Sequence, residues 1–242
     1  MEPRPLANVL LGQLPAAELE RLRGHLSRVE IVEGQVLYEA RAAIEHAYFL
    51  ESGMVSVITS DAEGSPGIEV GMIGREGVVG LSAMFDAAAV SFYRTIVQLP
   101  GWALRIGAAD MLQAGAELTT LRFLCFRYLH ASMVQTAQNA ACNLMHTVQQ
   151  RVAKWILMAH DCVEGSEIPI KHQFLANMLG VRRPSTTLAL AGLQEAGVIE
   201  THRGRLIVLD RTRLEASGCA CYRLITDELR RAIRCDWPPH AP

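Results

Sequence analysis

Two adjacent arginines, Arg182 and Arg183, carry the most definite chemistry in this chain. A guanidinium group presents its N–H donors as a planar fork, which matches paired acceptors such as O6 and N7 of guanine and also binds phosphate oxygens. Three short hydroxyl side chains, Ser185, Thr186 and Thr187, follow directly and add further hydrogen-bonding groups. Such donors recognise a ligand only if a rigid element holds them together on one exposed surface.

Two helices joined by a tight turn are predicted around these arginines. Apolar residues at helical spacing, including Leu175 and Met178, indicate a short first helix, and Gly180 suits a left-handed turn after it. The second helix begins at the arginine pair, because Pro184 is tolerated in a first turn, and Gly197 ends it. The arginines therefore stand at the start of the second helix.

A basic hairpin is predicted after the second helix. Strand-like runs at 198–201 and 206–209 flank a tip of His202, Arg203, Gly204 and Arg205. Residues 171–213 contain seven Lys or Arg and three Asp or Glu, although the net charge of the chain is −2. Helix, turn, helix and basic hairpin in this order predict a winged helix-turn-helix that binds double-stranded DNA. The predicted DNA contacts are Lys171, His172, Arg182, Arg183, Ser185, Thr186, Thr187, His202, Arg203 and Arg205.

Length and composition allow one large domain or two ordinary domains with a proper hydrophobic core, since the chain has 242 residues and half of them are hydrophobic. No apolar run is long enough to span a bilayer, and the apolar patch near the N-terminus is too short for a signal peptide. We therefore expect a cytoplasmic protein with no membrane partner.

The cysteines predict reduced thiols rather than a disulfide framework, because six are scattered through a mid-sized chain without a secretion signal. They are Cys125, Cys142, Cys162, Cys219, Cys221 and Cys235. Only Cys219 and Cys221 with Cys235 approach a metal-binding group, and one intervening residue is less than the usual two to four. We expect no metal site.

The first half of the chain predicts a β-barrel or sandwich. A helix with Leu19, Leu22, Leu26 and Val29 on one face is expected over residues 15–29. Short apolar runs separated by Gly-bearing or polar turns then extend to about residue 106, which is typical of a closed antiparallel structure.

A long helical region is predicted from about residue 108 to 160, with a break near 143–147. Phe126, Leu129, Met133, Thr136 and Ala140 recur at alternating three- and four-residue steps, the spacing of a coiled-coil seam. We expect this stripe to pair with a second copy of the chain, since winged-helix proteins commonly bind two half-sites as symmetric dimers. The alternative is that the stripe packs on the barrel.

A barrel, a long helix and a winged helix-turn-helix in this order resemble the Crp/Fnr family of bacterial transcription regulators. The segments YFLESGMV (48–55), GREGVVGLSAMF (74–85) and VQQRVA (148–153) carry the resemblance together with the helix-turn-helix. It implies an α+β chain that binds a two-fold symmetric DNA site as a homodimer, with RNA polymerase as a further partner. The implied divisions are an N-terminal β-roll or jelly-roll barrel (1–115), a long dimerisation helix (116–145), a C-terminal winged helix-turn-helix domain (146–215) and a C-terminal helical extension (216–242).

The resemblance also implies an effector pocket in the barrel, lined by Gly80, Leu81, Ser82, Ser91, Phe92, Arg94, Thr95 and Thr136. Members that bind a cyclic nucleotide place Glu, Arg and a hydroxyl residue where this chain has Leu81, Ser91 and Phe92. Leu and Phe supply neither an acceptor for a ribose nor a cation for a phosphate. If the loop of this chain is three residues longer than in those members, Arg94 and Thr95 take the positions of the Arg and the hydroxyl residue. The Glu that binds the ribose is still missing. We expect no bound cofactor and no control by cAMP.

Other sensors of the family match this chain poorly. Iron–sulfur members carry an N-terminal cysteine cluster, and no cysteine precedes Cys125. Haem-binding relatives use a His or Cys from the barrel, and the nearest candidates in this chain are His25, His46 and His130, but a lone His is more often structural. Two alternatives remain open. The first is a regulator whose barrel pocket binds a cyclic nucleotide or another small ligand. The second is a thiol redox sensor that uses Cys125 or Cys142 near the dimer seam and Cys219 and Cys221 just after the wing.

The recognition helix predicts a changed DNA preference. Cyclic-nucleotide-responsive members read bases with Arg, Glu and Arg at the positions of Arg183, Pro184 and Leu188, so one of the three is kept. No phosphate-binding Gly-rich loop, metal-spaced His/Glu set or nucleophile arrangement supports an enzyme. A ligand-binding module without a DNA role is the other class, and the basic winged helix argues against it.

Overall fold

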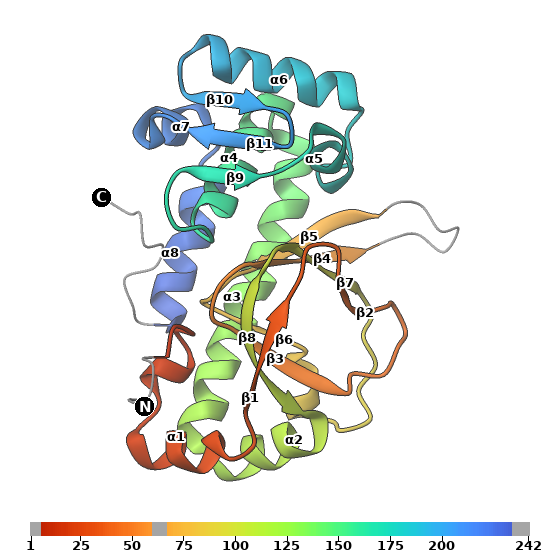
Figure 1. The fold of residues 1–242 in the computed structure, drawn as a ribbon, viewed down its shortest axis with the longest axis vertical. Coiled ribbons are helices and arrows are strands. Elements are labelled where there is room, and N and C mark those ends of the chain that lie inside the picture. Colours follow the sequence, from red (N-terminus) through yellow and green to blue (C-terminus); the bar gives the residue numbers. More distant parts are fainter. Residues whose placement is uncertain (1–5, 60–66, 234–242) are drawn as a thin grey trace.

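The computed structural model describes residues 6–59 and 67–233, and it confirms the predicted order of barrel, long helix and winged helix (Figure 1). Two four-stranded antiparallel sheets, ordered β1-β8-β3-β6 and β2-β7-β4-β5, form the barrel within this part of the chain. The strands are β1 (Ser27–Ile31), β2 (Val36–Tyr38), β3 (His46–Leu50), β4 (Met54–Thr59), β5 (Ile68–Ile73), β6 (Val78–Val79), β7 (Arg94–Leu99) and β8 (Gly101–Gly107).

Short helices close the ends of the barrel. They are η1 (Leu11–Gln13), α1 (Ala16–Arg23), η2 (Leu81–Met84) and α2 (Ala108–Glu117). The helix expected over residues 15–29 is shorter than predicted, because α1 ends at Arg23 and Val29 lies in β1 opposite Ala103 of β8. Pairing with β8 satisfies the backbone hydrogen-bonding groups of this segment, and the β-branched Val favours a strand.

The long helix α3 (Thr119–Met145) runs from the base of the barrel to the winged helix (Figure 1). Glu18 of α1 fixes its start, since the carboxylate oxygens accept the N–H groups of Thr120 and Leu121 at 3.1 Å. The predicted break is confirmed: His146 is extended, and Thr147 caps α4 (Val148–His160) through a capping box.

The C-terminal part contains the predicted winged helix-turn-helix. Its elements are β9 (Glu167–Pro169), α5 (His172–Met178), α6 (Arg183–Glu195), β10 (Ile199–His202) and β11 (Arg205–Val208), followed by α7 (Arg211–Ser217) and α8 (Cys221–Ile233). Strand β9 adds to the hairpin, giving the order β10-β11-β9. Helix α8 then packs back along α3 (Figure 1).

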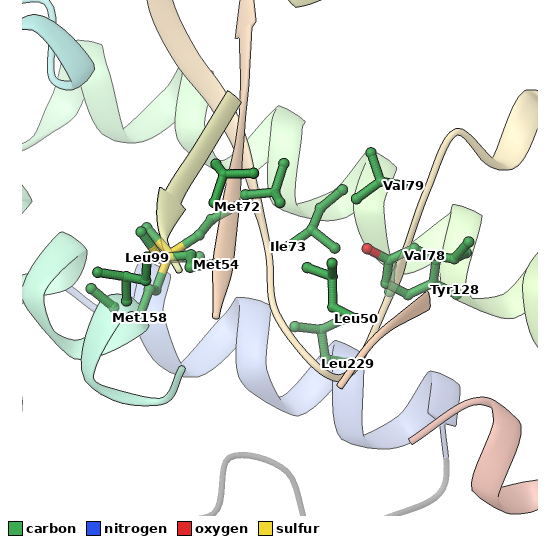
Figure 2. Close-up of a cluster of buried hydrophobic side chains, with 14 of the residues drawn as sticks. Leu50, Met54, Met72, Ile73, Val78, Val79, Leu99, Tyr128, Met158 and Leu229 are labelled. Carbon is green, nitrogen blue, oxygen red and sulfur yellow. The ribbon is translucent and has the colours of Figure 1, made fainter. Parts of the chain in front are cut away.

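The barrel and the C-terminal helices share one hydrophobic core. Figure 2 shows Met158 of α4 beside Met54 and Leu99 of the barrel, and Leu229 of α8 beside Leu50. The two domains are therefore packed together. None of the helices in the described ranges is long and apolar enough to cross a membrane.

Candidate nucleic-acid interface and barrel cavity

The arginine pair stands at the exposed start of α6. Arg182 is the extended N-cap residue, and Pro184 is in the first turn, where its missing N–H leaves no helical bond unmade. The preceding Gly180 has φ +61°, and a Cβ there would lie 3.0 Å from Cδ1 of Ile68 in β5. Both arginines are exposed, and neither forms an ion pair within the part of the chain that the structure describes. Both guanidinium groups are therefore available to an external partner.

The three hydroxyl residues that follow do not share one face. Ser185 and Thr187 are exposed, whereas Thr186 is fully buried and its hydroxyl has no hydrogen-bond partner. The burial of Thr186 contradicts its prediction as a DNA contact, because one residue along a helix turns the side chain by about 100° toward the core. Leu188, by contrast, is 76% exposed on this helix, and it was not among the predicted contacts.

The wing is held against the recognition helix. Gln194 of α6 accepts hydrogen bonds from the backbone N–H and the hydroxyl of Thr201, at 3.0 and 2.6 Å. The tip is a two-residue turn, Arg203-Gly204, in which Gly204 has φ +80°. The position of the wing is therefore fixed relative to α6.

Acidic partners reduce the positive charge of the wing flanks. His202 lies 3.1 Å from a Glu200 carboxylate, and Arg205 lies 3.4 Å from Glu167. Arg203 at the tip and Lys171 at the start of α5 are exposed, and His172 is half-buried. The predicted contacts whose positive charge is least reduced by acidic neighbours are therefore Lys171, Arg182, Arg183 and Arg203.

A buried carboxyl group joins the barrel to the DNA-binding domain. Trp155 of α4 donates its indole N–H to Glu69 of β5 at 2.9 Å, and the Ser56 hydroxyl donates to the other oxygen. Burial raises the pKa of Glu69 to about 7, although both hydrogen bonds and the charge of Lys154 act in the opposite direction. This contact links strand β5 directly to the first helix after α3.

A cavity of about 690 Å³ that is open to solvent lies between the barrel and α3. Neither Leu81 nor Phe92 fills it; Leu81 lies in the wall, and Phe92 is 74% exposed. Among the described residues, none with a charged side chain lines it. The lining consists of Tyr38, Ile44, Val57, Val70, Gly71, Ile73, Val78, Val79, Gly80, Leu81, Ser82, Phe85, Val90, Ser91, Phe92, Tyr93, Thr95, Tyr128, Leu129, Ser132, Met133, Gln135, Thr136 and Ala137.

The structure places seven of the eight predicted pocket residues in this lining and contradicts the prediction for Arg94. Successive side chains of β7 alternate, so Thr95 is buried in the wall while Arg94 points outward and pairs with Glu39 at 3.2 Å. None of the candidate haem ligands His25, His46 and His130 lines the cavity.

The predicted seam of α3 is an exposed stripe. Phe126, Leu129, Met133, Thr136 and Ala140 all lie on the solvent side, with Met133 65% exposed. The opposite face packs on the barrel, where the side-chain amide of Gln135 pairs with the backbone of Met72 at 2.9 and 3.2 Å. The alternative that the stripe itself packs on the sheet is therefore wrong.

Comparison with known proteins supports both domains. Residues 28–117 match the model of the cyclic nucleotide-binding domain, and residues 150–217 match that of the Crp-like helix-turn-helix domain. A global nitrogen regulator from Nostoc sp. is 26% identical over 172 residues, which cover 68% of this chain and 77% of that protein.

Solved structures share the fold at low identity. FixK2 from Bradyrhizobium japonicum has a TM-score of 0.67 at 13% identity, covering 81% of this chain and 98% of that one. A Crp/Fnr-family regulator from Eubacterium rectale has a TM-score of 0.65 at 18% identity, with coverages of 88% and 97%. The cyclic nucleotide-binding domain precedes the helix-turn-helix domain in this chain, which agrees with the barrel and the winged helix of the structure. The arginines are exposed at the start of the recognition helix. The chain is therefore a DNA-binding transcription regulator and belongs to the Crp/Fnr family.

Proposed function

We propose that the chain binds a two-fold symmetric DNA site as a homodimer and that cAMP does not control it. The observation that carries the proposal is the exposed, uncommitted Arg182 and Arg183 pair at the start of α6. In this arrangement α6 enters the major groove, and Arg203 and Lys171 contact phosphates on either side.

The exposed residues of α6 favour a half-site with a guanine and a neighbouring thymine. Arg183 donates its fork to O6 and N7 of the guanine, with Arg182, Ser185 and Thr187 as accessory contacts. Leu188 lies farther along the helix, and its exposed methyl groups suit the C5-methyl group of thymine. An apolar contact there replaces the second arginine of the cyclic-nucleotide-responsive members.

The exposed α3 stripe supports pairing of two copies. An apolar surface running along a 27-residue helix is costly to leave in water, and a parallel helix pair would cover it. Two-fold symmetry then places the recognition helices one helical turn of DNA apart, roughly 34 Å. RNA polymerase stays a predicted partner, and family membership supports a regulator without catalytic activity.

The composition of the cavity supports the loss of cAMP control. A buried cyclic phosphate needs a cation to replace its hydration, and the lining supplies only neutral side chains. An uncharged, largely apolar molecule would fit this surface better. The redox alternative based on Cys125 has little support, because burial raises the pKa of this thiol to about 12 and thereby suppresses the reactive thiolate.

Selection of binding sites from random duplexes, followed by gel shift at several salt concentrations, tests the proposal. We expect a palindromic site and a steep loss of affinity with salt. Arg183→Ala should weaken binding by on the order of 10-fold to 100-fold and relax the preference for guanine. Arg223→Ala, which removes an exposed charge from α8, is the matched control and should bind normally. Unchanged affinity and base preference in Arg183→Ala would contradict the assignment.

A further inference from the structure

Three cysteines and one histidine meet where α3 passes the start of α8. Cys142 and His146 come from the end of α3, and Cys219 and Cys221 flank the beginning of α8. The Sγ atoms of Cys142 and Cys219 are 3.5 Å apart, and Sγ of Cys221 lies 3.4 Å from Nδ1 of His146. All four potential ligand atoms lie within 4.8 Å of one another.

The separations of 3.5 and 3.4 Å match those between ligands of a single metal ion, and the bound of 4.8 Å on the other pairs requires them to move closer by at most about 1 Å. Tetrahedral zinc with Zn–S bonds of about 2.3 Å and a Zn–N bond of about 2.0 Å separates its ligand atoms by roughly 3.5 to 3.8 Å. An iron–sulfur cluster would hold the thiolates on different iron atoms and spread the sulfurs farther apart. Three thiolates and one imidazole are a common ligand set for structural zinc. The geometry and the donor set therefore agree on one mononuclear ion.

The supporting helices orient the ligands. Cys142 lies in the last turns of α3, and His146 is the residue that directly follows this helix. Cys219 lies between α7 and α8, and Cys221 is the first residue of α8. The three cysteines are almost fully buried and form a small cluster separate from the main core, whereas His146 is half-buried at its edge.

Charged and polar neighbours favour thiolates at this position. The side-chain amide of Gln138 lies 3.1 Å from Sγ of Cys221 as a donor. The charge of the buried Lys154 also acts on Cys142. Arg151, buried like Lys154, interacts electrostatically with Cys142 and Cys219. Three thiolates with a divalent ion leave one negative charge, which these two cations offset.

We propose that Cys142, His146, Cys219 and Cys221 bind one zinc ion, or another thiophilic divalent ion, in each chain. The ion joins the end of α3 to the start of α8. Because His146 directly precedes the Thr147 cap of α4, it also holds the link through which α3 reaches the DNA-binding domain. This site is additional to DNA binding and does not depend on the identity of the DNA site.

Metal content and cobalt spectroscopy of the full chain, purified with a reductant, test the proposal. Elemental analysis should find one zinc ion per chain. After removal of the zinc, titration with Co²⁺ alone should produce the visible bands of tetrahedral cobalt and thiolate charge-transfer absorption at one equivalent. Cys219→Ser and Cys221→Ser should weaken binding by at least about 100-fold, since each removes a ligand.

Two further variants separate loss of a ligand from loss of the fold. Cys162→Ser is the matched control, because Cys162 is a half-buried thiol outside the cluster and bonds to the carbonyl of Met158. It should keep the metal. Cys221→His replaces one ligand by another and should retain cobalt with a shifted spectrum.

Three results would overturn the proposal. The first is that the reduced chain binds neither Zn²⁺ nor Co²⁺ at micromolar concentration. The second is that Cys162→Ser loses as much metal as Cys219→Ser. The third is that Cys142 and Cys219 form a disulfide in air and, after reduction, take up no metal; the pair would then be a redox pair.

Discussion

Replacing Glu69 by Gln should change how the stability of the protein depends on pH. Glu69 is completely buried between β5 and α4, where burial raises the pKa of its carboxyl group to about 7. The folded chain therefore keeps a proton that the unfolded chain releases near pH 4.5. Gln is neutral at every pH, and its amide oxygen still accepts the indole N–H of Trp155. The variant keeps the hydrogen bond between the domains and removes the ionisation.

The sign and size of the effect follow from linkage. Below pH 4.5 the carboxyl group is protonated in both states and contributes no pH dependence. Between pH 4.5 and 7 the folded state binds more protons, so the free energy of unfolding falls as the pH rises. The span from 4.5 to about 7, at about 1.4 kcal/mol for each pH unit, sets an upper bound of about 3 kcal/mol above pH 7.

Urea unfolding from pH 5 to pH 8, followed by tryptophan fluorescence, measures this difference. Glu69→Gln should be more stable than the natural chain by about 1 to 3 kcal/mol at pH 8 and nearly equal to it at pH 5. Burial raises the pKa of Glu76 and of Asp161 to about 7 as well, so only the difference between the two chains isolates Glu69. The exposed Glu30→Gln on β1 is the control and should leave the pH dependence unchanged.

Equal slopes of stability against pH in the natural chain and in Glu69→Gln would refute this reasoning. So would a variant that is less stable than the natural chain at pH 8. Either result would mean that Glu69 stays ionised in the folded protein, held by its attraction to the buried Lys154.

Three further predictions concern the dimer, the turn and the cavity. Met133→Asp should shift the chain to a monomer in analytical ultracentrifugation while Met133→Leu stays dimeric, and a dimeric Met133→Asp would exclude the stripe as the interface. Gly180→Ala should lower the free energy of unfolding by on the order of 1 kcal/mol in denaturant titrations, because φ is +61° and the new Cβ meets Ile68; equal stability would contradict this. Calorimetric titration with cAMP should give no binding at low-micromolar concentration, and saturation there would show that the neutral lining around Leu81 does accept the phosphate.

The features that the sequence predicted well depend on local chemistry. Gly180, Pro184 and Gly197 mark the turn and the ends of α6 through their own backbone preferences, and the structure has φ +61° at Gly180 and +67° at Gly197. The three- and four-residue spacing of the seam likewise predicted α3. Such signals involve neighbouring residues only, so no knowledge of the tertiary fold was needed.

The errors arose where the direction of a side chain depends on packing. Thr186 was grouped with its neighbours by sequence, but the rotation of α6 turns it into the core. Arg94 and Thr95 were considered as a pair, although adjacent residues of a strand face opposite sides. Cys142 and Cys219 are separated by 77 residues, and only the return of α8 along α3 brings them together. The four-residue spacing of Cys142 and His146 was the local signal that was overlooked.

Helix α3 is one of several elements that connect the barrel to the DNA-binding domain. Leu129, Met133 and Thr136 line the cavity and also belong to the exposed seam, so an occupant of the cavity would touch the surface that faces a second copy. Beyond the seam, α3 ends at Met145 and His146 is extended. The helical hydrogen bonds of α3 therefore do not continue into α4. The domains are instead joined by the core shared with α8 and by the Glu69–Trp155 contact. We therefore expect a change in the barrel to reach the DNA-binding domain through the side-chain contacts around the end of α3 rather than through the backbone of the helix.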